Sequence, residues 1–266
     1  MILHSKPFFK HFLLLLIVTG TFLGVCSAQN GSKKFTYQYE SVRMDSVYDE
    51  SVDLTIATFI ENLRIQMGEK LNEVIGEASI DLPRFKPQSP LSNFLADQLL
   101  IFGNQYFKSQ GIQESIDLSL INFGGIRANL NAGKIKVEHI YQIAPFDNYA
   151  VILYLKGSEL RKMYKRFSEK ENGALSQSQT VFQNGRIVSY TINGVPIDDQ
   201  KVYKMITLDF LQHGGDGFLE GIQFEKVLYT GVLIRDVYIE RIKQITYEGK
   251  KIEAKTDQRV IIKPTP

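Results

Sequence analysis

The sequence predicts a mixed α/β fold in a single domain. Short runs rich in β-formers and bounded by turn residues alternate with segments whose apolar residues recur at helical spacing. The alternation continues along the chain without internal repeats, low-complexity stretches or an obvious linker. A hydrophobic content of 44% is that of an ordinary globular protein. These observations indicate one domain with a single core.

The first 28 residues have the features of a secretory signal peptide. Lys6 and Lys10 supply a positive start, and residues 12–25 form an apolar run that is short for a membrane span. Small residues follow, so we expect cleavage after Ala28 and an exported protein, periplasmic or secreted. Cys26 offers a lipoprotein alternative, which is less favoured because Val25 is larger than the residue that usually precedes a lipidated cysteine.

The composition beyond residue 28 excludes several partners. Lys6 and Lys10 are the only charged residues of 1–28, so the rest of the chain carries 29 basic and 29 acidic residues. This balance gives no electrostatic reason to expect nucleic acid, and a membrane is expected only if Cys26 is lipidated. Cys26 is also the only cysteine, so the exported chain must be held together by its core rather than by disulfides.

The first expected elements precede residue 70. Residues 29–49 are expected to form a leader followed by a strand within 35–44 (FTYQYESVRM). The domain is expected to occupy 50–266 and to begin with an amphipathic helix over 50–69. Its apolar residues at helical spacing are Val52, Ile56, Phe59, Ile60, Leu63 and Met67.

A strand and a second helix follow. Residues 73–82 (EVIGEASIDL) are expected to form a strand, and 83–90 a connection. A helix is expected over 89–107, with Ser89 as its N-cap and Pro90 in its first turn. Asn93 and Asp97 are four residues apart and therefore share one face of this helix.

The remaining elements continue the alternation. Asn-Gly pairs within 180–197 indicate hairpins. The expected elements are a strand over 115–123, a short helix and turn over 137–146, a buried strand over 149–155, a capped helix over 157–167, the hairpins, a strand over 201–211, a helix over 234–245 and a closing strand within 251–263.

Catalytic and metal-binding motifs are absent from this sequence. His4 and His11 belong to the signal peptide, which leaves His139 and His213, and two histidines without cysteine partners cannot form a usual zinc or two-metal hydrolase site. There is no GxSxG, HExxH or GK[ST] motif. We therefore expect no catalytic residue and no metal or other cofactor in this chain. His139 is expected to be structural, whereas His213 adjoins a glycine loop and could line a site.

Two loops combine glycines or a turn with side chains suited to ligand binding. INFGGIR places Asn122 and Arg127 around paired glycines just after an expected strand. The glycines allow close backbone approach and the guanidinium suits phosphate or carboxylate, although a tight turn with a surface arginine is an alternative. APFDN places Phe146 in a turn after Pro145, where by itself such a residue is more often a core aromatic.

A third loop, DFLQHGGDGF (209–218), repeats this combination. Phe210 and Phe218 flank Asp216, but the loop lacks the lysine and the strand–loop–helix pattern of a phosphate-binding loop. Aromatic side chains on separate loops could instead enclose a planar ring, and Asp216 could accept hydrogen bonds from ribose hydroxyls.

Taken in order, these motifs resemble a known family. NFLAD, NFGGIR, APFDN, KGSEL, FLQHGGDGF and the segment 230–242 resemble the C-terminal, nucleoside-binding domain of secreted 5′-nucleotidases, over about 50–263. The resemblance implies a single four-layered α/β domain. It implies that Phe146 and Phe210 stack on the base, that Asp216 contacts the ribose, and that Asn122 and Arg127 contact the base edge, ribose or phosphate side. Asn93 and Asp97 then look architectural.

Two departures from the family pattern limit what the resemblance implies. The family often has an arginine about six residues before the asparagine of the helix motif, where this chain has Pro87, with Arg84 and Lys86 nearby, so a phosphate contact from this segment is in doubt. The family's enzymes also carry an N-terminal metallophosphatase half with two metals, and residues 29–50 could not supply its ligands.

The hypothesis is a split enzyme of nucleotide catabolism. This chain would bind the nucleoside or nucleotide, and a separate metallophosphatase chain, docked on the helix over 50–69, would hold divalent metals and hydrolyse the phosphate. The main alternative is a stand-alone nucleoside-binding module without catalysis. A degenerate structural domain and a self-sufficient hydrolase are the remaining possibilities, and the phenylalanines do not specify a base because every base has a π-face.

Overall fold

The computed structural model describes residues 38–40 and 53–264, and the side chain of Gln66 is outside this description. The expected signal peptide and leader lie outside the described residues, as does most of the strand expected over 35–44, of which 38–40 have no regular structure. The chain divides into two units between Ile56 and Ala57, and the fold below is that of the second unit. None of the described helices is both long and apolar enough to cross a membrane.

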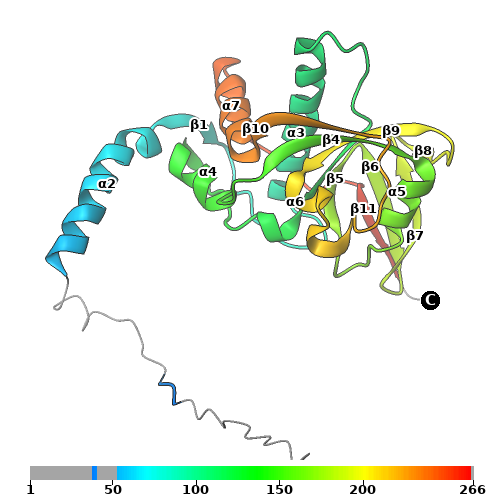
Figure 1. The fold of residues 1–266 in the computed structure, drawn as a ribbon, viewed down its shortest axis with the longest axis horizontal. Helices are drawn as coiled ribbons and strands as arrows, with labels where there is room; N and C mark the ends of the chain where they lie inside the picture. The colour runs from blue at the N-terminus through cyan, green and yellow to red at the C-terminus, as the bar shows by residue number, and fades with distance from the viewer. Residues whose placement is uncertain (1–37, 41–52, 265–266) are drawn as a thin grey trace, which may run out of the picture. The chain divides into compact units, whose positions relative to one another are not determined.

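A five-stranded mixed sheet forms the centre of the fold (Figure 1). β2 and β9 are parallel, and the other neighbours are antiparallel. The inner strands are almost continuously buried, as expected for a sheet covered on both faces. The strand order is β10 (Lys226–Leu233), β4 (Tyr149–Lys156), β9 (Val202–Leu208), β2 (Leu118–Asn122) and β5 (Gly173–Ser176). The predicted mixed α/β class is confirmed.

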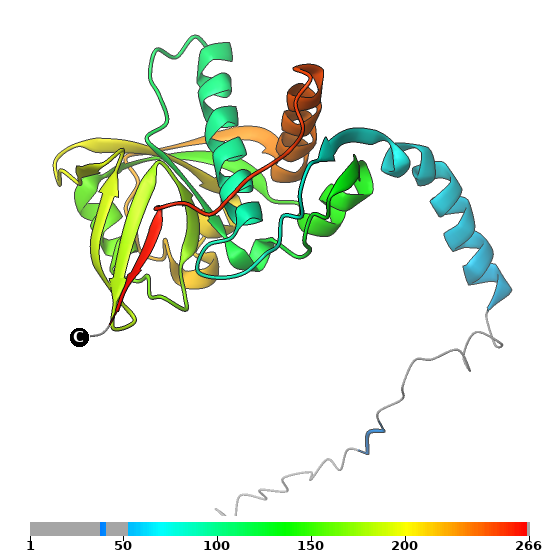
Figure 2. The same ribbon diagram turned by 180° about the vertical axis from the view of Figure 1, so that it is seen from behind.

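Two long helices lie side by side in both views of the ribbon, α3 (Pro90–Ser109) and α7 (Ile234–Tyr247) (Figures 1 and 2). α3 starts where the sequence predicts: the Ser89 hydroxyl accepts a hydrogen bond from the Ser92 amide, and the Ser92 hydroxyl accepts one from the Ser89 amide. Pro90 occupies the first turn, where a missing N–H has no cost.

Two smaller sheets complete the second unit. The hairpins predicted over 180–197 are confirmed, and both Asn-Gly pairs have positive φ, as type I′ turns require: 53° and 74° at Asn184 and Gly185, and 52° and 75° at Asn193 and Gly194. One sheet has the order β11 (Val260–Lys263), β6 (Ser178–Gln183), β7 (Arg186–Ile192) and β8 (Val195–Pro196); the other pairs β1 (Val74–Ala78) with β3 (Gly133–Lys136).

The helix expected over 157–167 is α5 (Gly157–Tyr164), but its N-terminus lacks the side-chain cap that the sequence analysis assumed. The amides of Gly157 and Ser158 instead donate to the carbonyls of Lys201 and Asp199, from the loop before β9. A side chain at Gly157 would collide with the Asp198 carbonyl. Backbone from a distant segment therefore satisfies this helix end, which no local motif could reveal.

Several elements differ from the prediction or were missed. The first helix is α2 (Leu54–Asn72), about three residues later than expected, and the short helix before the APFDN turn is α4 (Val137–Ile143). β3, β5, β10 and α6 (Asp209–Gln212) were not predicted. β10 is a half-exposed edge strand and α6 has a single turn, so neither produces a strong periodic signal.

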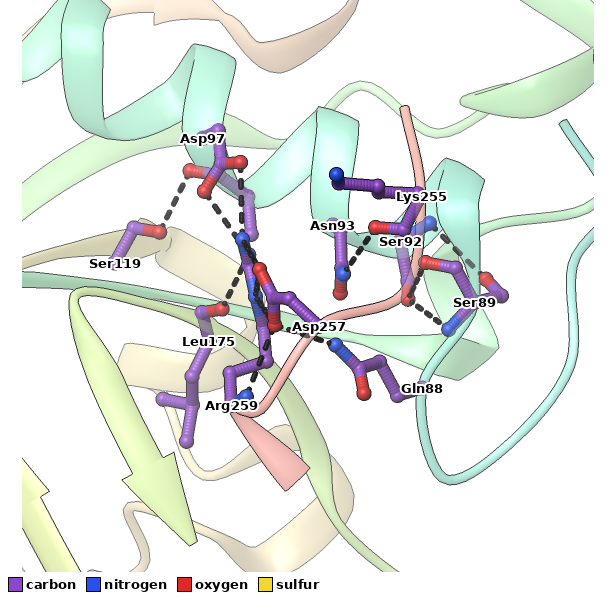
Figure 3. Close-up of polar contacts among 11 residues, drawn as sticks. Gln88, Ser89, Ser92, Asn93, Asp97, Ser119, Leu175, Lys255, Asp257 and Arg259 are labelled. Carbon is purple, nitrogen blue, oxygen red and sulfur yellow. Dashed lines mark hydrogen bonds and ion pairs between the residues drawn. The ribbon is translucent and has the colours of Figure 1, made fainter. Parts of the chain in front are cut away.

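The C-terminal segment, defined here as residues 255–259, is tied to α3 by polar contacts (Figure 3). The Asn93 amide donates to the Lys255 carbonyl (2.9 Å), and both Asp97 oxygens accept from the Arg259 guanidinium (2.9 and 3.1 Å). Arg259 also pairs with Asp257 and donates to the Leu175 carbonyl in β5. Asn93 and Asp97 thus hold chain segments together, in agreement with an architectural role.

Candidate functional site

The loops with the predicted binding residues lie at one end of the central sheet. β2 and β9 are parallel, so the loops that follow Asn122 and Leu208 leave the sheet on the same side. β4 runs antiparallel to β9, with Ala150 opposite Leu208, so the turn containing Phe146 enters the sheet at that side as well. The topology therefore brings together three loops that are distant in sequence.

A hydrogen bond joins two of these loops. Asn122, which is 5% exposed, donates from Nδ2 to Asp216 Oδ2 at 2.7 Å, across 94 residues of sequence. The glycines of FGGIR make this contact possible: a methyl group placed on Gly125 would lie 2.7 Å from Asn122 Oδ1, and one on Gly124 would lie 3.6 Å from Asp216 Oδ2. Gly125 therefore leaves room for the Asn122 side chain, and close approach of the loop backbone to a ligand stays a prediction.

The loop of Asp216 is a turn with positive φ angles that is anchored to the core. Asp216 has φ of 54°, between Gly214 and Gly217 at 94° and 72°. Arg166 donates to the Gly217 and Phe218 carbonyls at 3.0 Å, and the buried Phe218 ring packs edge-to-face on Phe167. Phe218 is thus the core anchor of the loop. Asp216 remains exposed at the tip, with its second oxygen available to a ligand.

Phe146 and Phe210 are the exposed aromatics of the site, at 49% and 42% exposure. Phe210 packs on the backbone of Gly215, where an added methyl group would collide with its ring. Asp209 accepts hydrogen bonds from the amides of Phe210 and Tyr149, which links the Phe210 loop to the start of β4. Neither phenylalanine pairs with another aromatic ring in the described part of the chain.

Arg235, at the start of α7, holds the Phe146 turn in place. Its guanidinium pairs with Asp147 at 2.7 Å, donates to the Pro145 carbonyl and lies 4.2 Å from the centre of the Tyr141 ring. Burial lowers the pKa of Arg235, but the contacts with Asp147 and Tyr141 outweigh it and leave the pKa above its usual value. No local motif marks Arg235, because its partner Asp147 is 88 residues away.

Two arginines border the glycine loop from different segments. Arg127 is exposed and donates to the Gly124 carbonyl, and Arg84 donates to the neighbouring Phe123 carbonyl, both at 3.3 Å. Neither is ion-paired with a carboxylate among residues 53–264. Lys86, in contrast, is paired with Glu171 at 3.0 Å. Of the two basic residues near Pro87, Arg84 is therefore the one beside the loop.

A narrow pocket of about 20 Å³ lies beneath this loop cluster. Its wall is mostly apolar, and its polar members include Asn122 and Asn148. Asn122 Oδ1 is buried without a hydrogen-bond partner among the described residues, which is an unsatisfied acceptor at the centre of the candidate site. Tyr238 of α7 also lines the pocket, and burial raises the pKa of its phenol. Asn148 belongs to the APFDN motif, but the sequence analysis did not select it.

The two histidines of the described residues, His139 and His213, differ in their surroundings, as the sequence predicts. His139 is structural: its Nδ1 accepts from the Lys136 amide at the start of α4. His213 is exposed after α6, beside the Asp216 loop. The described residues contain no group of three or more His, Cys, Asp or Glu side chains that could hold a metal ion.

Sequence comparison identifies the family. Residues 74–221 match the profile of the 5′-nucleotidase, C-terminal domain, family, and this match covers more than half of the chain, which therefore belongs to that family. The predicted resemblance is confirmed.

Individual relatives extend the match over most of the chain. A 5′-nucleotidase-related protein of Glossina morsitans morsitans is 23% identical over 84% of this chain and 44% of its own length. Protein UshA of Yersinia enterocolitica is 29% identical over 73% of this chain and 35% of its own length. The chain thus spans less than half the length of these curated relatives.

Solved structures agree with the fold assignment. The 5′-nucleotidase precursor of Thermus thermophilus has a TM-score of 0.65 at 25% identity, over 80% of this chain and 44% of its own. The NAD nucleotidase of Haemophilus influenzae has a TM-score of 0.58 at 18% identity, over 80% of this chain and 42% of its own, which supports the fold alone. The fold is that of the 5′-nucleotidase C-terminal domain.

Proposed function

We propose that this chain is the substrate-recognition half of a 5′-nucleotidase-type phosphohydrolase and binds the nucleoside part of a nucleotide. The observation that carries the proposal is the Asn122–Asp216 hydrogen bond at the sheet end where Phe146 and Phe210 are exposed. A polar pair near half-exposed aromatic rings suits a ligand with a planar base and a hydroxyl-bearing sugar.

Each site residue then has a role in the bound state. Phe146 and Phe210 stack on the base, and Asp216 accepts hydrogen bonds from the ribose through the oxygen that Asn122 leaves free. Asn122 holds that carboxylate in place through its Nδ2. Arg127 and Arg84 donate to carbonyls of the glycine loop, and two cations without carboxylate partners among the described residues suit the phosphate.

Hydrolysis is assigned to a separate metallophosphatase chain that carries the divalent metals. This division of labour is physically reasonable because in-line attack on phosphorus needs metals near the phosphate, whereas specificity comes from contacts to the base and sugar. Membership of the 5′-nucleotidase C-terminal domain family supports the recognition part of this division. We place the complex outside the cytoplasm, periplasmic or secreted, with lipidation at Cys26 as the alternative.

Calorimetry with adenosine tests the recognition role. Phe210→Ala is expected to weaken adenosine binding roughly 10- to 100-fold, because stacking on an aromatic contributes about 1–3 kcal/mol per base. Tyr247→Ala is the matched control: Tyr247 is 93% exposed at the end of α7, so its removal leaves the affinity unchanged. Equal affinities of the wild type and Phe210→Ala would refute the stacking role.

The alternative function is a stand-alone nucleoside-binding module. The same site residues support it, because binding a nucleoside requires no catalytic group. AMP hydrolysis by this chain mixed with a candidate metallophosphatase distinguishes the two. Adenosine binding without any activity gain or complex formation would favour the binding module.

A further inference from the structure

Three arginines are largely buried, and one of them lacks a counter-charge. Arg235 pairs with Asp147, and Arg259 pairs with Asp97 and Asp257. Arg241 is only 8% exposed, yet among residues 53–264 it has no carboxylate within ion-pair distance. Charged side chains are rarely buried unless they are paired, so Arg241 is unusual within this protein.

The neighbours of Arg241 are neutral amides. Its Nε donates to Gln98 Oε1 at 3.1 Å, and its Nη1 donates to Gln244 Oε1. Its Nη2 donates to none of the described residues and is not among the fully enclosed polar atoms, so it remains open to solvent. Burial lowers the pKa of Arg241, and Glu248 is the only carboxylate among the described residues that opposes this effect. The site therefore leaves part of a positive charge uncompensated.

Arg241 lines a groove of about 640 Å³ between α3, the end of α7 and residues 248–253. Lys250 and Lys251 line the same groove and add two further cations. Each is ion-paired with a carboxylate, Lys250 with Glu248 at 2.8 Å and Lys251 with Glu77 at 2.6 Å. Glu248 and Glu253 also line this groove, so its lining has three cations and two carboxylates. The second groove beside Arg241, of about 480 Å³, has Arg241 and Lys243 against Asp236 and Glu240 and is less suited to an anion.

We propose that the groove containing Arg241, Lys250 and Lys251 binds a small oxyanion, a phosphate or carboxylate group, with the free Nη2 edge of Arg241 as its main partner. A guanidinium presents paired donors that match such groups. The groove shares no residue with the candidate nucleoside site, so the proposal is independent of the proposed function.

Phosphate titration at constant ionic strength tests the proposal, with chloride as the balancing anion. At a phosphate concentration ten times the Kd, the wild-type Tm is expected to rise by about 3–5 °C. Arg241→Gln removes the charge and is expected to lose this rise. Arg186→Gln, at an exposed arginine of β7 outside both sites, is expected to retain it. The general stabilising effect of phosphate is common to all variants and cancels in the comparison.

An equal rise in wild type and Arg241→Gln, or no rise in wild type, would overturn the proposal. If Arg241→Gln does not fold, Lys250→Gln/Lys251→Gln provides the second variant, with ³¹P line broadening of inorganic phosphate as the measurement. Several-fold weaker phosphate binding is expected for this pair of exposed substitutions. Unchanged binding would mean that the groove does not hold the anion.

Discussion

At the scale of single residues, the candidate site depends on one side chain positioning another. Asn122 is buried at the end of β2 and holds Asp216 Oδ2 at 2.7 Å, which fixes a carboxylate at the tip of a turn with positive φ. A non-glycine residue in that conformation costs about 1 kcal/mol or more and persists only when its surroundings impose it. Arg166 and the buried Phe218 impose it here from the other side of the turn.

Gly125→Ala tests this arrangement. The added methyl group would lie 2.7 Å from Asn122 Oδ1, so Asn122 must move and release Asp216. We expect adenosine affinity to fall at least about tenfold, since one charge-assisted hydrogen bond contributes about 1.5–3 kcal/mol. Calorimetry measures the affinity, and circular dichroism checks that the fold is retained.

Gly68→Ala is the matched control for that substitution. Gly68 lies inside α2, and the nearest atom to an added methyl group is 3.9 Å away. Adenosine affinity is expected to stay the same and helix stability to rise slightly, because alanine favours the helix over glycine. A loss of affinity in Gly68→Ala equal to that in Gly125→Ala would contradict the role of the Asn122 contact.

At the scale of elements, the C-terminal segment 255–259 joins α3 to the sheets. Arg259 contacts Asp97 on α3, Asp257 in its own segment and the Leu175 carbonyl in β5 (Figure 3). β5 pairs with β2, and Leu175 lies opposite Leu120, two residues before Asn122. Through β5, the Arg259 network therefore supports β2, the strand that ends in Asn122.

The pH dependence of stability reports on this network. Burial raises the pKa of Asp257, but the hydrogen bonds and charge of Arg259 outweigh it and hold the pKa below its usual value. A depressed folded-state pKa contributes stability that is fully present above the unfolded-state pKa, about 3.9, and is lost as the pH falls through the lower folded-state value.

Asp257→Asn is therefore expected to reduce the free energy of unfolding at pH 7 by about 1 kcal/mol or less, because the Asp257 side chain is 42% exposed and solvent screens the pair. The difference from wild type is expected to shrink below about pH 4. Urea denaturation across this range measures it, with the exposed Glu240→Gln as control. A difference that is the same at pH 3 and pH 7 would show that the ion pair does not cause it.

At the scale of the whole molecule, α2 has an apolar face without a partner in the described structure. Phe59, Ile60, Leu63 and Met67 are 40–63% exposed. α2 ends at Asn72, just before residue 74, where the match to the family's C-terminal domain begins. On the basis of this exposed apolar face, we propose α2 as the docking helix for the catalytic chain.

Phe59→Ser/Leu63→Ser tests the docking role. Loss of two large apolar contacts is expected to weaken the complex with the metallophosphatase by at least about tenfold and to reduce AMP hydrolysis in the mixture accordingly. Adenosine binding by the variant alone should not change. Glu61→Ser, on the opposite and exposed side of the same helix, should leave the complex intact. Undiminished complex formation by Phe59→Ser/Leu63→Ser would exclude α2 as the docking helix.

Local chemistry determined much of this protein in advance. The α3 start at Ser89 and Pro90, the two Asn-Gly hairpins and the mixed α/β class follow from hydrogen-bonding and φ preferences of neighbouring residues, which are visible in the sequence. The five candidate site residues were selected from their motifs and the family resemblance, and their binding roles stay predictions. The structure adds that Asn122 and Asp216 touch.

What only the tertiary structure decided involves partners far apart along the chain. Three features depend on such contacts: the loop before β9 caps α5, Arg235 holds the Phe146 turn, and Arg84 lies beside Phe123. The missing counter-charge of Arg241 among the described residues is also a tertiary fact. Periodicity and motifs report the preferences of neighbouring residues, whereas these features arise from folding, which alone brings distant segments together and sets which charges are buried.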